Sequence, residues 1–342
     1  MHTAGPAVAE EAALQHLRSH DRGKTYSVPW AEGSGYTAAA DYPQPCDDCI
    51  IMHQDADVVI VNKPAFLPTE NTRQIKDSVR ARVEAALAVQ GEPTAELHVA
   101  HRLDWETSGL LILARHAAAM RSLSRQFADR VVAKKYTADV VGAPPQPSGI
   151  IDLPLAADRL HPPRQCVDLQ AGKPAKTRWA VLANEGGGGR DLGGEGGSDG
   201  DAGGSDGSDG DGGGSGGRNG STRCVRLRLS PESGRRHQLR LHMLALGCPM
   251  VGDTLYAPPP GATHPRLHLH ASELGFEHPA TGEWMVFTSP PPFTLPVALP
   301  TAATAPAQPC AGLRPAALRC WNAVCGCALG TPTVLLNCLN WL

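Results

Sequence analysis

Two charged side chains stand two residues apart, directly before an apolar run, in the stretch HRLDWETSGLLILAR at residues 101–115. The run at residues 110–114 is too short to span a membrane and predicts a buried strand. Because residues two apart in an extended segment point to the same side, Arg102 and Asp104 would lie together at the entrance to the core. A carboxylate there must be paired, hydrogen-bonded or used in chemistry. Asp104 is therefore a candidate catalytic residue, and a turn-capping aspartate is the structural alternative.

A glycine-rich segment divides the chain. Residues 186–220 contain 19 glycines among 35 residues and carry a net charge of −5, so the rest of the 342-residue chain, whose total is −3, carries +2. This segment cannot bury enough apolar surface to offset its ordering entropy, and we expect a disordered loop. The mildly basic remainder has clustered arginines, which permits a polyanionic partner.

Kinase, serine-hydrolase and metal chemistry find no support in the motifs. Leu103 interrupts a kinase-like HRD, and outside residues 186–220 there is no GxGxxG, VAIK, DFG, P-loop, GxSxG or HExxH motif. His237 and His242 are five apart on a predicted helix, so they do not share a face. His268 and His270 share a strand face but lack a carboxylate at ligand spacing. We expect structural histidines and no metal ion.

Cysteine usage and the termini bear on the compartment. Ten cysteines without a recognisable secretory signal indicate reduced thiols instead of a disulfide framework. The uncharged final 23 residues are interrupted by glycine, proline and asparagine, so a membrane anchor is not expected. We expect an intracellular protein, with the cytoplasm and an organelle (mitochondrion or chloroplast) both open.

Apolar periodicity supplies the framework that must position the candidate residues. Helical spacing predicts helices over residues 76–90, 116–130 and 235–247, the last with Arg236 and Arg240 bordering its buried stripe. Strand patterns cover residues 58–61, 110–114, 132–141, 174–183, 223–229, 267–271, 273–277 and 283–288. Without a strict strand–helix alternation, these elements indicate an α+β fold with a mixed, mainly antiparallel sheet and flanking helices.

Several segments follow one another in the order of a known family. HRLDWETSGLLILAR, KKYTADVVG, GKPAKT, SGRRHQLRLHMLALGCPMVGDTLY and LHLHASELGFEHPATGEWMVFTSPPPF resemble the successive motifs of pseudouridine synthases, specifically the RluA family. The resemblance implies a pseudouridine synthase catalytic domain over residues 50–296, interrupted by the glycine-rich loop. A poorly ordered leader, residues 1–49, would precede it, and a low-complexity or apolar tail, residues 297–342, would follow it.

The resemblance also implies a role for each matching residue. Asp104 matches the catalytic aspartate, and Tyr136 matches the tyrosine that packs against the target uracil. Arg240 matches the basic residue that forms a salt bridge with the catalytic aspartate, and Arg102 matches the arginine that fills the gap left by the flipped nucleotide. Three further residues are expected to bind RNA: His101, Arg236 and His237.

The implied activity is the isomerisation of a specific uridine in structured RNA, in an rRNA or tRNA stem-loop, with base flipping. This reaction needs no ATP, redox cofactor or metal. We expect RNA as the partner, no required protein partner, and a monomer. The alternative is a catalytically inactive RNA-binding or RNA-folding protein on the same fold.

Overall fold

The computed structural model of the chain describes a defined set of residues, to which all statements below refer. These are residues 17–20, 24–27, 43–45, 47–73, 75–92, 97–182, 222–257, 264–296 and 298–299. The predicted loop at residues 186–220 lies outside them. So does the predicted tail at residues 297–342, except for Ala298–Leu299.

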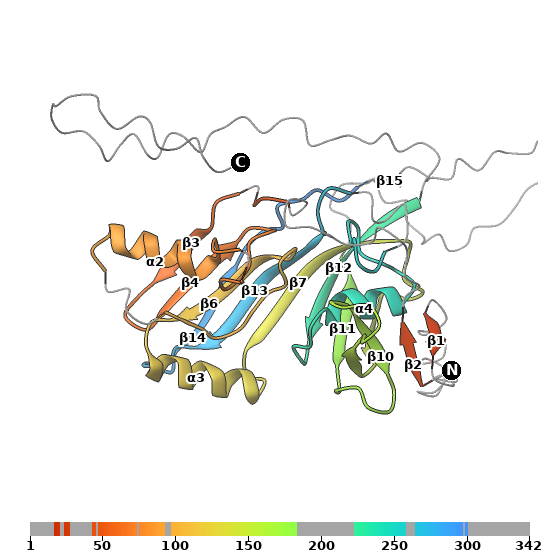
Figure 1. Ribbon diagram of the computed structural model, residues 1–342, viewed down its shortest axis with the longest axis horizontal. Helices are drawn as coiled ribbons and strands as arrows, with labels where there is room; N and C mark the ends of the chain where they lie inside the picture. The colour runs from red at the N-terminus through yellow and green to blue at the C-terminus, as the bar shows by residue number, and fades with distance from the viewer. Residues whose placement is uncertain are drawn as a thin grey trace, which may run out of the picture. The chain divides into compact units, whose positions relative to one another are not determined.

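One mixed sheet of eleven strands carries the fold (Figure 1). Its order is β3-β4-β6-β13-β7-β12-β11-β8, with β14 on β13, β15 on β12 and β5 on β6. Among the described strand pairs only β6–β13 is parallel, which confirms the predicted mixed, mainly antiparallel α+β fold. The strands are β3 Ile50–Gln54, β4 Val58–Lys63, β5 His98–Val99, β6 Ser108–Ala114, β7 Ala133–Val141, β8 Ser148–Asp152, β11 Lys176–Val181, β12 Thr222–Pro231, β13 Leu269–Glu277, β14 Trp284–Thr288 and β15 Ala298–Leu299.

A second sheet of four short strands has the order β1-β2-β10-β9. Its strands are β1 Arg18–His20, β2 Thr25–Ser27, β9 Leu155–Ala157 and β10 Gln165–Asp168. Part of the segment expected to be a loose leader is therefore paired with the rest of the chain, Tyr26 lying opposite Val167. Strands this short carry too few residues for a period-two pattern, so their pairing depends on the tertiary structure.

Helices α2 (Val79–Val89) and α3 (Ala117–Ala128) explain the unbroken apolar runs of β4 and β6. Alternate β4 residues face opposite sides of the sheet. Val59 and Val61 pack in the cluster that contains the α2 residues, and Val58 and Ile60 pack in the cluster that contains the α3 residues. Both faces of these strands are covered, so both sets of alternate positions must be apolar.

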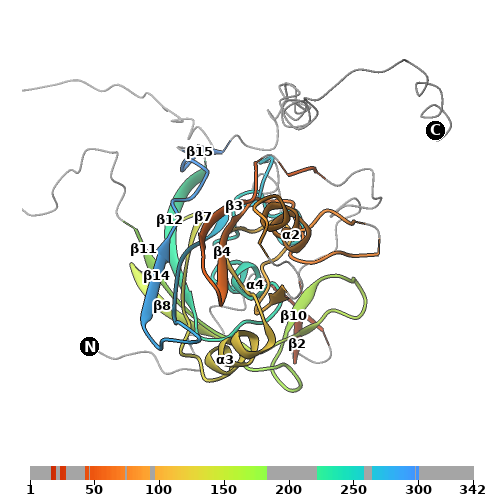
Figure 2. The same cartoon turned by 90° about the vertical axis from the view of Figure 1, so that its left-hand side faces the viewer.

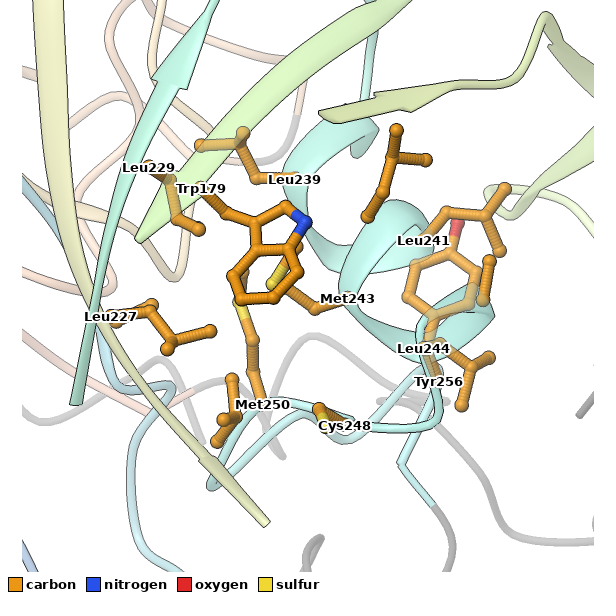
Figure 3. Packing of buried hydrophobic residues seen from close by; sticks show 14 of the residues in the cluster. Trp179, Leu227, Leu229, Leu239, Leu241, Met243, Leu244, Cys248, Met250 and Tyr256 are labelled. Carbon is orange, nitrogen blue, oxygen red and sulfur yellow. The ribbon is translucent and has the colours of Figure 1, made fainter. Parts of the chain in front are cut away.

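Helix α4 (Gln238–Ala245) packs on the β7–β12–β11 part of the sheet. Figure 3 shows Trp179 and Leu229 from the strands beside Leu239 and Met243 from the helix. Burying each such side chain contributes about 1.5–3 kcal/mol, so this cluster fixes the helix against the sheet. The helix begins three residues later than predicted because His237 adopts a left-handed conformation with φ 53°.

Strand β13 corrects one prediction and explains a glycine. Residues 267–271 and 273–277 are not two strands, since β13 runs continuously with a register shift against β7 between Ala271 and Glu273. A bulge changes which side chains share a face of the strand. The apolar alternation in the sequence is interrupted there, and the interruption looks like the end of a strand. Beside it, Gly109 has φ +118°, and a Cβ there would lie 2.4 Å from the Ala271 carbonyl oxygen.

In the described part of the chain, no helix is both long and apolar enough to cross a membrane.

Candidate active site

One pocket brings together four residues selected from the sequence. Its lining includes Arg102 and Asp104 from the loop before β6, Tyr136 from β7 and Arg240 from α4. Figures 1 and 2 show that α4 covers the face of the sheet near β7 and β12. Three elements far apart in sequence thus meet at one point, as the ordered motifs predicted.

The loop that carries Asp104 is fixed by its neighbours. Thr107 N–H donates to the Asp104 carbonyl oxygen at 3.1 Å, forming a turn at its base. Phe66 N–H donates to the Trp105 carbonyl oxygen at 2.8 Å, and Trp105 Nε1 donates to the Phe66 carbonyl oxygen at 2.6 Å. This reciprocal pair connects the loop to the segment after β4. The partly exposed Asp104 carboxylate therefore stands on a rigid base.

Lys63 holds the same two segments together from inside the protein. Its side chain is fully buried, and its Nζ donates to the carbonyl oxygens of Pro64 at 2.9 Å, Leu67 at 2.8 Å and Trp105 at 3.2 Å. Burial lowers the pKa of Lys63 to about 7, although the negative charge of Asp104 opposes this change. All three donors of the ammonium are used, so its role here is structural.

The expected salt bridge between Arg240 and Asp104 is not formed, because Arg240 pairs with two other carboxylates. Its Nε and Nη2 donate to the two Asp253 carboxylate oxygens at 2.9 and 2.6 Å, and its Nη1 donates to Glu106 at 2.6 Å. No salt bridge within 4.0 Å joins Arg240 to Asp104 among the described residues. A guanidinium has a fixed fork of donors, and two buried carboxylates already occupy this one.

The charges around Arg240 act on one another strongly. Burial by itself lowers the pKa of Arg240, but the charges of Asp253 and Glu106 outweigh it and hold that pKa well above its usual value. Asp104 adds a smaller effect in the same direction. Burial raises the pKa of Glu106, and Arg240 only partly opposes this.

Tyr136 lies where two clusters of the core meet. Its ring packs against the α4 cluster on one side and against the α2 cluster on the other. Burial raises the pKa of its hydroxyl well above the usual value, and Asp104 adds to the effect. The side chain is therefore a neutral phenol with its ring at the pocket wall.

The three residues expected to bind RNA do not line this pocket. His101 Nε2 accepts the Ile112 backbone N–H at 3.1 Å, and burial lowers its pKa to about 3. His237 is buried, its Nδ1 lies 2.8 Å from the Tyr256 hydroxyl, and burial lowers its pKa to about 4. Both rings are neutral and partnered, so the geometry gives them structural roles. Arg236 is exposed, which leaves it open to solution.

A possible metal-ligand group occurs away from the pocket. Asp55, Asp57 and His278 bring one ligand atom each within 4.8 Å of one another. However, His278 Nδ1 accepts the N–H groups of Ala280 and Thr281, which places the proton of the neutral ring on Nε2. That nitrogen lies 3.3 Å from Asp55 in an ion-pair contact, so both ring nitrogens of His278 already have partners.

Comparisons with known proteins agree with this geometry. A family model described as RNA pseudouridylate synthase matches residues 57–245. The dual-specificity RNA pseudouridine synthase RluA of Pasteurella multocida (strain Pm70) is 38% identical over 260 residues, which cover 75% of this chain and 100% of that protein. The protein of the same name from Escherichia coli (strain K12) is 38% identical over 247 residues, covering 71% and 94%. The chain belongs to the RluA family of RNA pseudouridine synthases.

Solved structures support the same fold. Human RNA Pseudouridylate Synthase Domain Containing 1 aligns with a TM-score of 0.53 and 23% identity, covering 74% of this chain and 87% of that one. The predicted fold is thereby confirmed, and the sequence comparisons confirm the predicted family. The chain is an isomerase that acts on uridine in RNA.

This pseudouridine synthase also uses residues that the sequence analysis did not select. Glu106 and Lys63 hold the Asp104 loop, and Asp253 takes most of the hydrogen bonds of Arg240. Glu106 stands two residues after Asp104, the same spacing that separates Arg102 from Asp104. This two-residue spacing is the sequence feature that could have indicated Glu106. Only the fold shows that the buried Arg240 lies opposite its carboxylate.

Proposed function

We propose that this enzyme converts one specific uridine of a structured RNA, in an rRNA or tRNA stem-loop, into pseudouridine with Asp104 as the nucleophile. The observation that carries the proposal is the position of Asp104 in one pocket with Tyr136, on a loop fixed by Lys63. The similar proteins from Pasteurella multocida and Escherichia coli are named dual-specificity RNA pseudouridine synthases, which supports a search in more than one RNA class.

In this reaction a carboxylate attacks a sugar carbon as a nucleophile, as it does in retaining glycosidases. An Asp104 oxygen attacks C1′, and the uracil leaves with the electron pair of the N1–C1′ bond. After the base has turned, C5 attacks C1′ and the carboxylate is released. The proton on C5 is lost and N1 gains one, so atoms and charge balance. Nothing is oxidised and no group leaves the RNA, so the reaction consumes neither ATP nor a redox cofactor.

The uridine must leave the RNA stack to reach Asp104. Tyr136 offers an aromatic face at the pocket wall, and its raised pKa keeps it uncharged, which favours packing against a base. Arg102 is exposed beside the pocket and would fill the space that the base leaves. The exposed Arg236 would contact a phosphate.

We also propose that RNA is the one partner the reaction needs. The protein would act as a monomer without a required protein partner. The compartment would be intracellular, either the cytoplasm or an organelle.

The test is Asp104→Asn, which keeps the shape of the side chain and removes its nucleophilic charge. Pseudouridine is mapped in unmodified transcripts of rRNA hairpins and tRNAs after incubation with each variant. The wild type should convert one defined uridine, and Asp104→Asn should lose roughly 1,000-fold or more in rate, on the scale of other nucleophile deletions. Binding of the same transcript should stay within about threefold.

Asp129→Asn is the matched control, because Asp129 is exposed at the end of α3 and does not line the pocket. It should convert at the wild-type rate. Turnover by Asp104→Asn would disprove the role of Asp104. A wild-type chain that binds RNA and leaves every uridine unchanged would instead support the inactive RNA-binding alternative.

A further inference from the structure

Strands β7 and β12 separate at one end and open a groove. Their last paired residues there are Tyr136 and Leu229, after which the chain segments at 130–135 and 230–235 diverge. A cavity of about 650 Å³ lies between them, bordered also by Phe127 from the end of α3. The groove therefore starts where the strand that carries Tyr136 leaves its neighbour.

The groove shares part of its lining with the pocket of Asp104. Lys134 and Arg235 line both cavities, together with the backbone of the segment that joins β12 to α4. The two cavities therefore adjoin, and a chain bound in the pocket would enter the groove past these shared residues. The two cations stand at the junction.

The groove carries an excess of positive charge. Its lining includes five cationic side chains and one acid: Arg130, Lys134, Lys135, Arg178, Arg235 and Glu232. Two of the cations are already neutralised, because Lys135 pairs with Glu273 at 2.7 Å and Arg178 pairs with Glu232 at 2.6 Å.

Three cations of the groove have no carboxylate partner within 4.0 Å among the described residues: Arg130, Lys134 and Arg235. Arg235 donates through Nε to the Pro174 carbonyl oxygen at 3.1 Å, which orients the side chain and leaves its terminal nitrogens for another acceptor. Lys134 stands 5.7 Å from the Phe127 ring centre, and burial lowers its pKa. A partly buried cation that has no anionic partner in the protein is strongly stabilised when a ligand brings an anion to it.

We infer that Arg130, Lys134 and Arg235 bind backbone phosphates of the RNA strand on one side of the flipped uridine, along the groove between β7 and β12. This inference rests on the proposed function, since it extends the RNA beyond the nucleotide in the pocket. Flipping distorts the backbone next to the target, and fixed cations there hold the phosphates in the distorted path. Single-stranded RNA follows positively charged grooves of this kind.

The first test is Arg130→Gln, because Arg130 lines the groove and not the pocket. Binding and turnover are measured on the transcript that the wild type converts, over a range of salt concentrations. Losing one phosphate contact should reduce the slope of log K against log salt by about 0.7–0.9. KM should rise, and kcat at saturating RNA should stay unchanged. Arg121→Gln is the matched control, because it loses the same charge within α3, the helix that ends two residues before Arg130, and Arg121 lies outside the groove.

The second test changes the RNA and leaves the protein intact. Single methylphosphonates, which carry no charge, replace each phosphate within three nucleotides of the target uridine. One substitution should weaken wild-type binding as much as Arg130→Gln does, and combining the two should cost nothing further. The methylphosphonate scan with the wild type does not depend on the variant: if no substitution within three nucleotides of the target weakens wild-type binding, the groove inference is wrong.

The outcomes separate the two proposals. If the wild type converts the uridine but Arg130→Gln keeps the wild-type salt slope, the groove inference is wrong. Equal losses from Arg130→Gln and Arg121→Gln would also overturn it, since they would reveal a general effect of net charge. If the wild type converts no uridine in any transcript, the proposed function itself has failed.

Discussion

The most demanding prediction concerns the buried charges under the pocket. Arg240→Met keeps most of the side-chain volume and removes the cation between Glu106 and Asp253, which are 5% and 1% exposed. Two carboxylates would then be buried without a counter-charge. Removing one partner of a buried ion pair typically costs 3–5 kcal/mol, so we expect a loss of about 4 kcal/mol in the free energy of unfolding. That is a large part of the roughly 5–15 kcal/mol of a natural domain.

A rescue distinguishes this explanation from a simple packing defect. In the Arg240→Met background, Glu106→Gln and Asp253→Asn remove both charges. The amide oxygens can still accept from Thr254 Oγ1, and from the backbone N–H groups of Leu255 and Tyr256, as the carboxylates do. The triple variant should therefore recover more than half of the stability that Arg240→Met loses.

Urea unfolding at pH 7, followed by tryptophan fluorescence, measures these differences from the midpoint and slope of each curve. A loss below about 1 kcal/mol for Arg240→Met would refute the reasoning, because it would mean that water or rearrangement satisfies the two carboxylates. A triple variant no more stable than the single one would refute it too, since the damage would then come from packing.

Two further predictions follow from backbone geometry and from buried histidines. In the same urea assay, Gly109→Ala should destabilise the fold by about 3 kcal/mol or more, because its Cβ would lie 2.4 Å from the Ala271 carbonyl oxygen. Gly282→Ala is the control: with φ +71° and no atom within 4 Å of the added Cβ, it should cost about 1 kcal/mol. His242 and His270 are fully buried, and burial lowers the pKa of each to about 4 from an unfolded value near 6.5. The unfolded chain therefore binds more protons than the folded chain between pH 7 and pH 5. The free energy of unfolding should fall by about 2 kcal/mol for each histidine over this range. An unfolding midpoint that does not change over this range would contradict the second prediction.

The larger elements of the fold could be predicted because their patterns repeat over many residues. Helix α2 and helix α3 match the expected helices closely, and β6 coincides with the apolar run after Asp104. The strands β8, β9 and β10 were not predicted, since they span three to five residues each in a proline-rich region. Segments this short acquire their conformation from their neighbours, and a pattern of one or two alternations carries no signal.

The candidate site divides in a similar way. The order of the motifs identified Asp104, Tyr136 and Arg240, and the pocket contains all three. The partner of Arg240 was predicted incorrectly. Charge type can be read from a sequence, but the choice among three nearby carboxylates depends on distances of an ångström or two. Here those distances place Glu106 and Asp253 on the guanidinium.

The sequence alone determined the family and the α+β class, and it predicted which residues would carry out uridine isomerisation, because these depend on residue type and on order along the chain. The tertiary structure decided which of those groups meet. It buried His101 and His237 as neutral structural rings, placed Lys63 behind the Asp104 loop, and opened the basic groove beside Tyr136. Burial and ion pairing arise between segments far apart in the chain. They are properties of the packed molecule and leave no local pattern in the sequence.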